Sequence, residues 1–119
     1  MRERIIMAVF DEIKLKSFKF TMNDLATRLS ISKTSLYENF SSKAELIAAC
    51  VEYLMLDLKK QESEIYNSNK SVLNKFRQLL VIKHKVYPLI NTAVYDELKK
   101  NYPEQWEKVN NFRQSRINN

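Results

Sequence analysis

Residues 21–46, TMNDLATRLSISKTSLYENFSSKAEL, decide the fold of this chain. Short segments with apolar residues at helical spacing are separated there by hydroxyl residues rather than by Gly or Pro. Thr21, with Asp24 three residues later, resembles a capping box in which Asp replaces the usual Glu or Gln. Ser42 and Glu45 have the spacing of the full box. Each pair therefore predicts the start of a helix.

Two helices joined by a sharp turn are expected inside this stretch. The first begins near Met22 and the second near Lys33, where Ser32 can accept a hydrogen bond from the free N–H groups of the first turn. The link from Ser30 to Ser32 is too short for anything but a helix-turn-helix. The residues expected to face inward are all apolar, and they are Leu25, Ala26, Leu29, Ile31, Leu36 and Phe40.

The outward side of the second helix carries short polar or amphipathic side chains within two turns. They are Lys33, Thr34, Ser35, Tyr37 and Asn39. Such side chains can donate to phosphates or reach the edges of bases. This face therefore has the chemistry for contact with double-stranded DNA.

The same stretch resembles the DNA-binding domain of the TetR/AcrR family of bacterial transcription regulators. The residues that carry the resemblance are Thr21, Leu25–Ala26, Ser32, Leu36–Tyr37, Phe40, Ser42–Lys43 and Leu46. The sequence departs from the family at Leu29–Ser30, where Ala-Gly is common, and at Thr34, where Gly is common.

The resemblance implies a function and a set of site residues. It implies a repressor that acts as a homodimer when intact and is released from a palindromic operator by a small-molecule effector. Tyr37 and Lys43 would hold phosphates, Thr21 would belong to the same interface, and the other outward residues, Lys33, Thr34, Ser35 and Asn39, would contact bases. The helix that begins at Lys43 would be the connecting helix whose tilt sets the separation of the two DNA-reading units.

The composition points to an all-α protein with one hydrophobic core. The chain has 119 residues, 45% of them hydrophobic, with no Gly and only two Pro. Hairpin turns and phosphate-binding Gly loops therefore lack their usual residue. No apolar run approaches the roughly 20 residues of a membrane span, and the first residues lack the apolar core of a signal peptide. We expect a cytoplasmic protein without a membrane partner.

Charge alone does not locate a DNA-binding face. The formal net charge is +6, which suits a nucleic-acid partner. Residues 1–46 contain eight Lys or Arg against six Asp or Glu, whereas residues 47–119 contain twelve against eight. Because many mildly basic helical proteins bind no nucleic acid, the DNA hypothesis depends on the motif.

Apolar periodicity predicts helices along the rest of the chain. They cover residues 3–16, a long segment from 43 that ends in the polar stretch near 67–69, a segment from 72 that closes before Pro88, about 91–101, and a last helix that begins at Pro103. Together these suggest a helix-turn-helix domain over residues 1–46 and a helical regulatory domain over 47–119. Members of the resembled family continue further, so we expect the second domain to be incomplete, although a natural short form remains the alternative.

Little in the sequence supports enzymatic chemistry. One His, one Cys and no Gly remove most nucleophilic, metal and nucleotide-binding constellations, so neither a cofactor nor a metal site is expected. Cys50, in an apolar segment, is expected to pack in the core. The main alternative is an all-α adaptor that binds only protein, which sequence-specific and salt-sensitive binding to duplex DNA would distinguish.

A small-molecule site is expected among the later helices by analogy with the family. The candidate lining residues are large and come from neighbouring predicted helices: Tyr53, Phe76, Leu80, Tyr87, Tyr95 and Trp106. The competing interpretation is that they form ordinary core.

Overall fold

The computed structural model describes the backbone of residues 1–86 and 92–117, and side chains within these ranges except at 82–86, 92–93, 113 and 115–117. Every regular element in the described part is helical, which confirms the all-α prediction. The elements are α1 (Arg2–Lys16), the 3₁₀ turn η1 (Ser17–Lys19), α2 (Met22–Leu29), α3 (Lys33–Asn39), α4 (Lys43–Tyr66), α5 (Val72–Val86), α6 (Thr92–Asn101) and α7 (Pro103–Ile117). Their bounds agree closely with the segments predicted from apolar periodicity.

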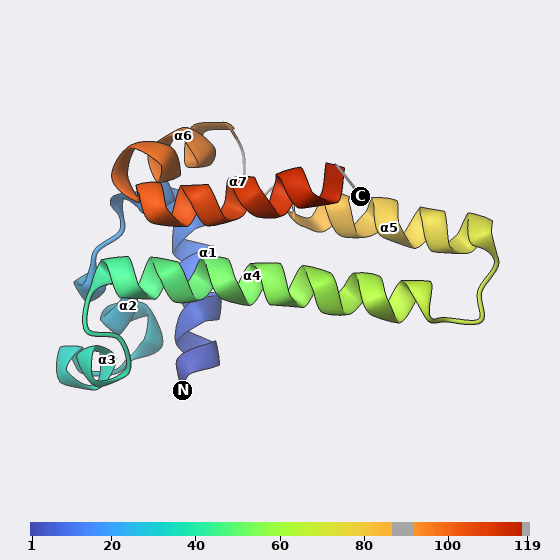
Figure 1. Cartoon of the computed structure of the whole chain (residues 1–119). Helices are drawn as coiled ribbons and strands as arrows, with labels where there is room; N and C mark the ends of the chain where they lie inside the picture. Colours follow the sequence, from blue (N-terminus) through green and yellow to red (C-terminus); the bar gives the residue numbers. More distant parts are fainter. Residues whose placement is uncertain (87–91, 118–119) are drawn as a thin grey trace.

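α4 is the element that joins the two ends of the molecule (Figure 1). α2 and α3 lie below its first turns and α1 crosses behind it, while α7 runs alongside it and α5 folds back along its far end (Figure 1). The predicted domain boundary after residue 46 lies inside this continuous 24-residue helix. None of the described helices is both long and apolar enough to cross a membrane.

The hydrophobic core is centred on the three N-terminal helices. Its largest fully buried side chains are Phe20, Phe40, Ile5, Leu25, Leu36, Leu46, Ile47 and Val9. All of the residues predicted to face inward from the helix-turn-helix are buried except Ile31, which is half-buried and packs against the same cluster. Val94 and Leu98 of α6 belong to this cluster, so the C-terminal helices share the core of the N-terminal ones.

Hydroxyl side chains begin the helices where the sequence predicts them. Thr21 Oγ1 accepts from the N–H of Asp24 at 3.0 Å, and the Asp24 carboxylate accepts from the N–H of Thr21 at 2.8 Å, which completes a capping box. The hydrogen bond from the Thr21 N–H is the main cause that lowers the pKa of Asp24. Asp can therefore replace Glu or Gln in this box.

The cap of α4 differs from the prediction in one respect. Ser42 Oγ accepts from the N–H of Glu45 at 3.1 Å, as expected. The Glu45 carboxylate, however, accepts from the N–H of Ser41 at 2.8 Å and from its hydroxyl, one residue before the cap. These two bonds, with the Ser41 hydroxyl first, lower the pKa of Glu45. The longer Glu side chain thus reaches past the cap residue and also orders the link from α3.

The turn between α2 and α3 adopts its geometry without Gly. Ser30 has φ 55° and ψ 42°, the left-handed conformation that Gly occupies most easily. The N–H of Ile31 donates to Ala26 O at 3.0 Å and the N–H of Ser30 to Thr27 O at 3.2 Å. These are the two hydrogen bonds of a Schellman motif, which closes α2. Ser30, at the position where the resembled family commonly has Gly, therefore adopts the conformation for which Gly is favoured.

We expect Ser30→Gly to stabilise the chain. A side chain in the left-handed region costs about 1–2 kcal/mol, and the greater freedom of Gly in the unfolded chain offsets about 0.5–1 kcal/mol of that gain. Urea denaturation should give a free energy of unfolding higher by about 0.5–1 kcal/mol. Ser30→Ala, which keeps a Cβ atom, is the control and should lack this gain; equal stability of the two variants would contradict the assignment.

Cys50 should be inert while the chain is folded. Burial raises the pKa of its thiol to about 12, so the thiolate fraction at pH 8 is about 10⁻⁴. Iodoacetamide should alkylate Cys50 quickly in urea and very slowly in native buffer, as mass spectrometry can follow. Rapid native labelling would show that this part of the core opens readily.

Candidate nucleic-acid interface

α3 is a seven-residue helix with one buried edge and one exposed edge. Ser32 Oγ accepts from the N–H of Ser35 at 3.1 Å and so caps its first turn. Leu36, which is fully buried, anchors the middle of the helix, and Phe40, also fully buried, follows its last residue. The opposite edge is therefore presented to solvent in a fixed orientation.

The exposed edge consists of Lys33, Thr34, Tyr37 and Glu38. Lys33 and Tyr37 are four residues apart, as are Thr34 and Glu38, so the two pairs form adjacent rows on one face. Tyr37 is 46% exposed. Glu38 was not among the predicted site residues, although its spacing from Thr34 could have indicated it. A carboxylate at this position can accept a hydrogen bond from cytosine N4.

Two of the residues predicted to contact bases already make hydrogen bonds within α3 and its N-terminal cap. Ser35 is half-buried and its Oγ accepts from the hydroxyl of Ser32 at 3.1 Å. Asn39 is also half-buried, and its Nδ2 donates to Ser35 O at 2.9 Å. These contacts stabilise the two ends of α3. Ser35 and Asn39 therefore have fewer free hydrogen-bonding groups for DNA than Lys33 or Thr34.

Lys43 lies between the start of α4 and η1. Its Nζ donates to Phe20 O at 2.5 Å and also to Phe18 O, and it lies 4.3 Å from the centre of the Phe20 ring. Burial lowers the pKa of Lys43, and the carboxylates of Asp24 and Glu97 partly compensate. The side chain expected to hold a phosphate is thus directed toward two backbone carbonyls of its own chain.

Replacing Lys43 should therefore cost stability. Lys43→Met leaves the carbonyls of Phe18 and Phe20 without this charged donor, and we expect a loss of about 1–2 kcal/mol in the free energy of unfolding by urea denaturation. Lys33→Met, at an exposed position, should change it by less than about 0.5 kcal/mol. Equal effects of the two substitutions would contradict an internal role for Lys43.

An ion pair fixes α2 against α1. Glu12 is only 3% exposed, and its carboxylate accepts from Arg28 Nε at 2.8 Å. Lys16 extends the network, with Nζ 3.7 Å from Glu12 and 3.4 Å from Asp24. Because a buried carboxylate needs this partner, α2 cannot slide along α1 without separating the charges.

α6 contacts the N-terminal helical unit at η1. Glu97 Oε2 accepts from the Ser17 hydroxyl at 2.9 Å and from the N–H of Phe18 at 3.3 Å. The rings of Phe18 and Tyr102 lie 5.5 Å apart between centres. Ser17 has φ 55°, a conformation unusual for a residue with a side chain, and the Glu97 contact helps to hold it. This turn is therefore held by Lys43 from one helix and by Glu97 from another.

The five predicted ligand-lining residues in the described part of the chain have different surroundings. Tyr53 donates to Glu3 at 3.3 Å and lies beside Phe10, and Trp106 packs against the core and under Lys99. Phe76 and Leu80 are 58% and 51% exposed, because the register of α5 turns them away from α4. Tyr95 is half-buried, and Tyr87 lies outside the described residues.

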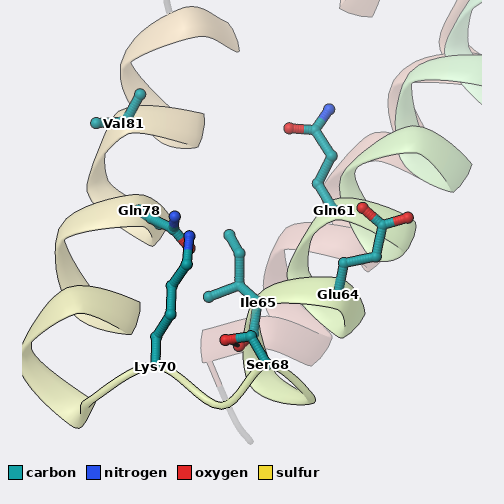
Figure 2. Close-up of a pocket in the computed structure, with 7 residues that line it drawn as sticks. All are labelled: Gln61, Glu64, Ile65, Ser68, Lys70, Gln78 and Val81. Carbon is teal, nitrogen blue, oxygen red and sulfur yellow. Dashed lines mark hydrogen bonds between the residues drawn. The ribbon is translucent and has the colours of Figure 1, made fainter.

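A surface groove of about 410 Å³ separates the end of α4 from α5 (Figure 2). It is lined by Gln61, Glu64, Ile65, Ser68, Lys70, Gln78 and Val81. Gln61 and Glu64 of α4 lie on one side and Gln78 and Val81 of α5 on the other, with Ile65 between them (Figure 2). Of the predicted ligand-lining residues that lie in the described part of the chain, none lines this groove. Over the described ranges, no group of three or more His, Cys, Asp or Glu side chains is placed to hold a metal ion.

Comparison with known proteins identifies the N-terminal unit. The sequence pattern of bacterial regulatory proteins of the tetR family matches residues 5–50, from α1 into α4. The chain is also 40% identical over 113 residues to the uncharacterised HTH-type transcriptional regulator YvaF of Bacillus subtilis, which covers 94% of this chain and 60% of that protein. The N-terminal unit belongs to the TetR family. The family resemblance inferred from residues 21–46 is thereby confirmed.

Two further proteins are similar to this chain. The nucleoid occlusion factor SlmA of Vibrio cholerae is 26% identical over 81 residues, 66% of this chain and 41% of that protein. The ketosteroid transcriptional regulator KstR2 of Mycobacterium tuberculosis matches 97% of this chain and 61% of its own with a TM-score of 0.73, at 16% identity, which shows a common fold. The chain spans about 60% of the length of YvaF and of the KstR2 chain.

Proposed function

We propose that this chain binds double-stranded DNA through the exposed edge of α3 and represses transcription. The observation that carries the proposal is a capped recognition helix, anchored by Leu36, whose outward face presents Lys33, Thr34 and Tyr37 to solvent. These side chains have the chemistry that the major groove requires, and the family membership of residues 5–50 supports the same assignment.

Each exposed side chain has a distinct role in this proposal. Lys33 pairs with guanine acceptors and the Thr34 methyl group packs against a thymine methyl, so both set sequence preference. The Tyr37 hydroxyl donates to a phosphate and sets position rather than preference. Thr21 Oγ1 accepts from a backbone N–H, so its hydroxyl hydrogen remains to donate to a phosphate near the start of α2.

Ser35, Asn39 and Lys43 contribute to binding mainly by shaping this face. Ser35 and Asn39 hold the two ends of α3 through their contacts with Ser32 and with one another. Lys43 fixes the start of α4 against η1. Their loss should therefore disturb the fold of the interface as well as its affinity for DNA.

The intact regulator is proposed to bind a palindromic operator as a homodimer. One seven-residue helix offers few base contacts, whereas two copies related by a twofold axis read two half-sites and multiply the selectivity.

A small-molecule effector is proposed to release the operator by moving α4. This helix begins beside α3 and extends to α5 and α7, so a shift at its far end changes the position of its first turn. The Glu97 contact with η1 provides a second connection between the later helices and the DNA-binding unit. Linkage requires that operator DNA change effector affinity by the same factor.

The proposal predicts that Lys33→Ala weakens binding mainly to preferred DNA. With a duplex selected from a random pool, fluorescence anisotropy should show a loss of about 1–3 kcal/mol, against a smaller loss on a scrambled duplex. Lys60→Ala, an exposed substitution on α4 away from α3, is the control and should leave the preference unchanged. If selection returned no preferred duplex, the function as an adaptor that binds only protein would be favoured instead.

A further inference from the structure

The first turn of α1 reaches the C-terminal ends of both helices of the helix-turn-helix. Arg4 Nη2 donates to Leu29 O, at the last residue of α2, at 3.2 Å. Arg2 Nη1 donates to Asn39 O, at the last residue of α3, at 2.6 Å. The two arginines come from the same turn, and the two carbonyls belong to residues 25 and 37 positions further along the chain.

A cation is well matched to these positions. The last carbonyls of a helix lack partners within the helix and carry the negative end of its dipole, so an Arg side chain there is stabilising. α3 has no basic residue in its own last turn, and Phe40, which follows it, is extended rather than left-handed. Its closing backbone hydrogen bond is from the N–H of Phe40 to Leu36 O. Arg2 therefore supplies from α1 the charged donor that α3 lacks locally.

A second contact fixes the guanidinium of Arg2. Its Cζ atom lies 4.2 Å from the centre of the Phe40 ring, which is fully buried. Stacking on the ring and donation to Asn39 O constrain the planar group in two directions, which an ammonium could not reproduce. Arg2 thus connects α1 to the point where α3 ends and the chain turns toward α4.

We propose that Arg2 is a positioning residue for DNA recognition, which sets the angle of α3 by holding its C-terminal end against α1. The inference rests on the proposed DNA-binding function of α3. In this role Arg2 acts through Asn39 O and Phe40 and does not itself contact a phosphate. Arg4 acts on the end of α2 in the same way.

Salt dependence separates positioning from phosphate contact. Removing a side chain that neutralises a phosphate lowers the slope of log K against log salt concentration by about one unit per copy. Removing a side chain that only orients α3 weakens binding but leaves the number of released counterions unchanged. Hydrogen exchange at the end of α3 gives a second measurement, which does not require DNA.

The experiment compares Arg2→Met with Arg2→Lys and Arg77→Met in the 119-residue chain. Arg77 is exposed on α5, far along the sequence from the helix-turn-helix, so Arg77→Met is a matched substitution. We expect Arg2→Met to weaken binding to the selected duplex about three- to tenfold with an unchanged salt slope. Amide exchange over residues 36–40 should become several-fold faster, Arg2→Lys should recover part of both losses, and Arg77→Met should reproduce neither.

Two results would overturn the positioning role. One is a salt slope that falls by about one unit in Arg2→Met, which would make Arg2 a phosphate contact. The other is unchanged exchange over residues 36–40, which would show that the contact with Asn39 O does not hold α3. If the unmodified chain bound no duplex, the proposed function would fail, yet the exchange measurement would still decide whether Arg2 holds the helix. Circular dichroism of each variant verifies that the fold persists.

Discussion

A helix of seven residues is too short to be stable by itself, and this constraint governs the N-terminal half of the molecule. Isolated helices below about 12–15 residues are marginal in water, so α3 must derive its stability from contacts with other elements. Ser32 caps its first turn, Leu36 anchors its middle in the core, and Arg2 occupies its C-terminal end. The exposed edge that is proposed to meet DNA is rigid because the opposite edge and both ends are held.

The same principle explains why η1 connects the two halves of the chain. This single turn has its carbonyls bound by Lys43 from the start of α4 and its Phe18 N–H bound by Glu97 from α6. Lys43 and Glu97 are far apart in sequence, but they meet on the same few backbone atoms. A movement of α6 or α4 must therefore strain or break contacts to η1, which gives the later helices a physical connection to the helix-turn-helix.

Local chemistry made most of the helix bounds predictable. Hydroxyl caps, apolar periodicity and the positions of Pro88 and Pro103 act over a few residues, and the helices begin and end close to where these features predict. Even Ser30, which replaces Gly in the turn, adopts the left-handed conformation, because the Schellman hydrogen bonds and the burial of the flanking helices outweigh its steric cost.

The functions of individual side chains were less predictable, because their partners are distant in sequence. No residue near Lys43 in the sequence indicates that its ammonium donates to the carbonyls of Phe18 and Phe20. Likewise, no residue near Arg2 indicates that its guanidinium donates to Asn39 O. Likewise, the large side chain of Phe76 did not indicate which face of α5 packs against α4. In the structure Phe76 is exposed. Periodicity establishes that a helix has an apolar face, but the face that meets a neighbour depends on packing across the whole chain.

This distribution of partners also explains why net charge is a poor guide to the interface. Of the eight Lys and Arg in residues 1–46, five make internal contacts through hydrogen bonds or ion pairs: Arg2, Arg4, Lys16, Arg28 and Lys43. Lys14, Lys19 and Lys33 remain exposed and lack such contacts within the described part of the chain. The cations of this unit therefore serve mainly its own architecture, and only Lys33 of the remaining three lies on α3. Selective binding by so few free charges depends on how accurately α3 is oriented, which is the property that the internal cations provide.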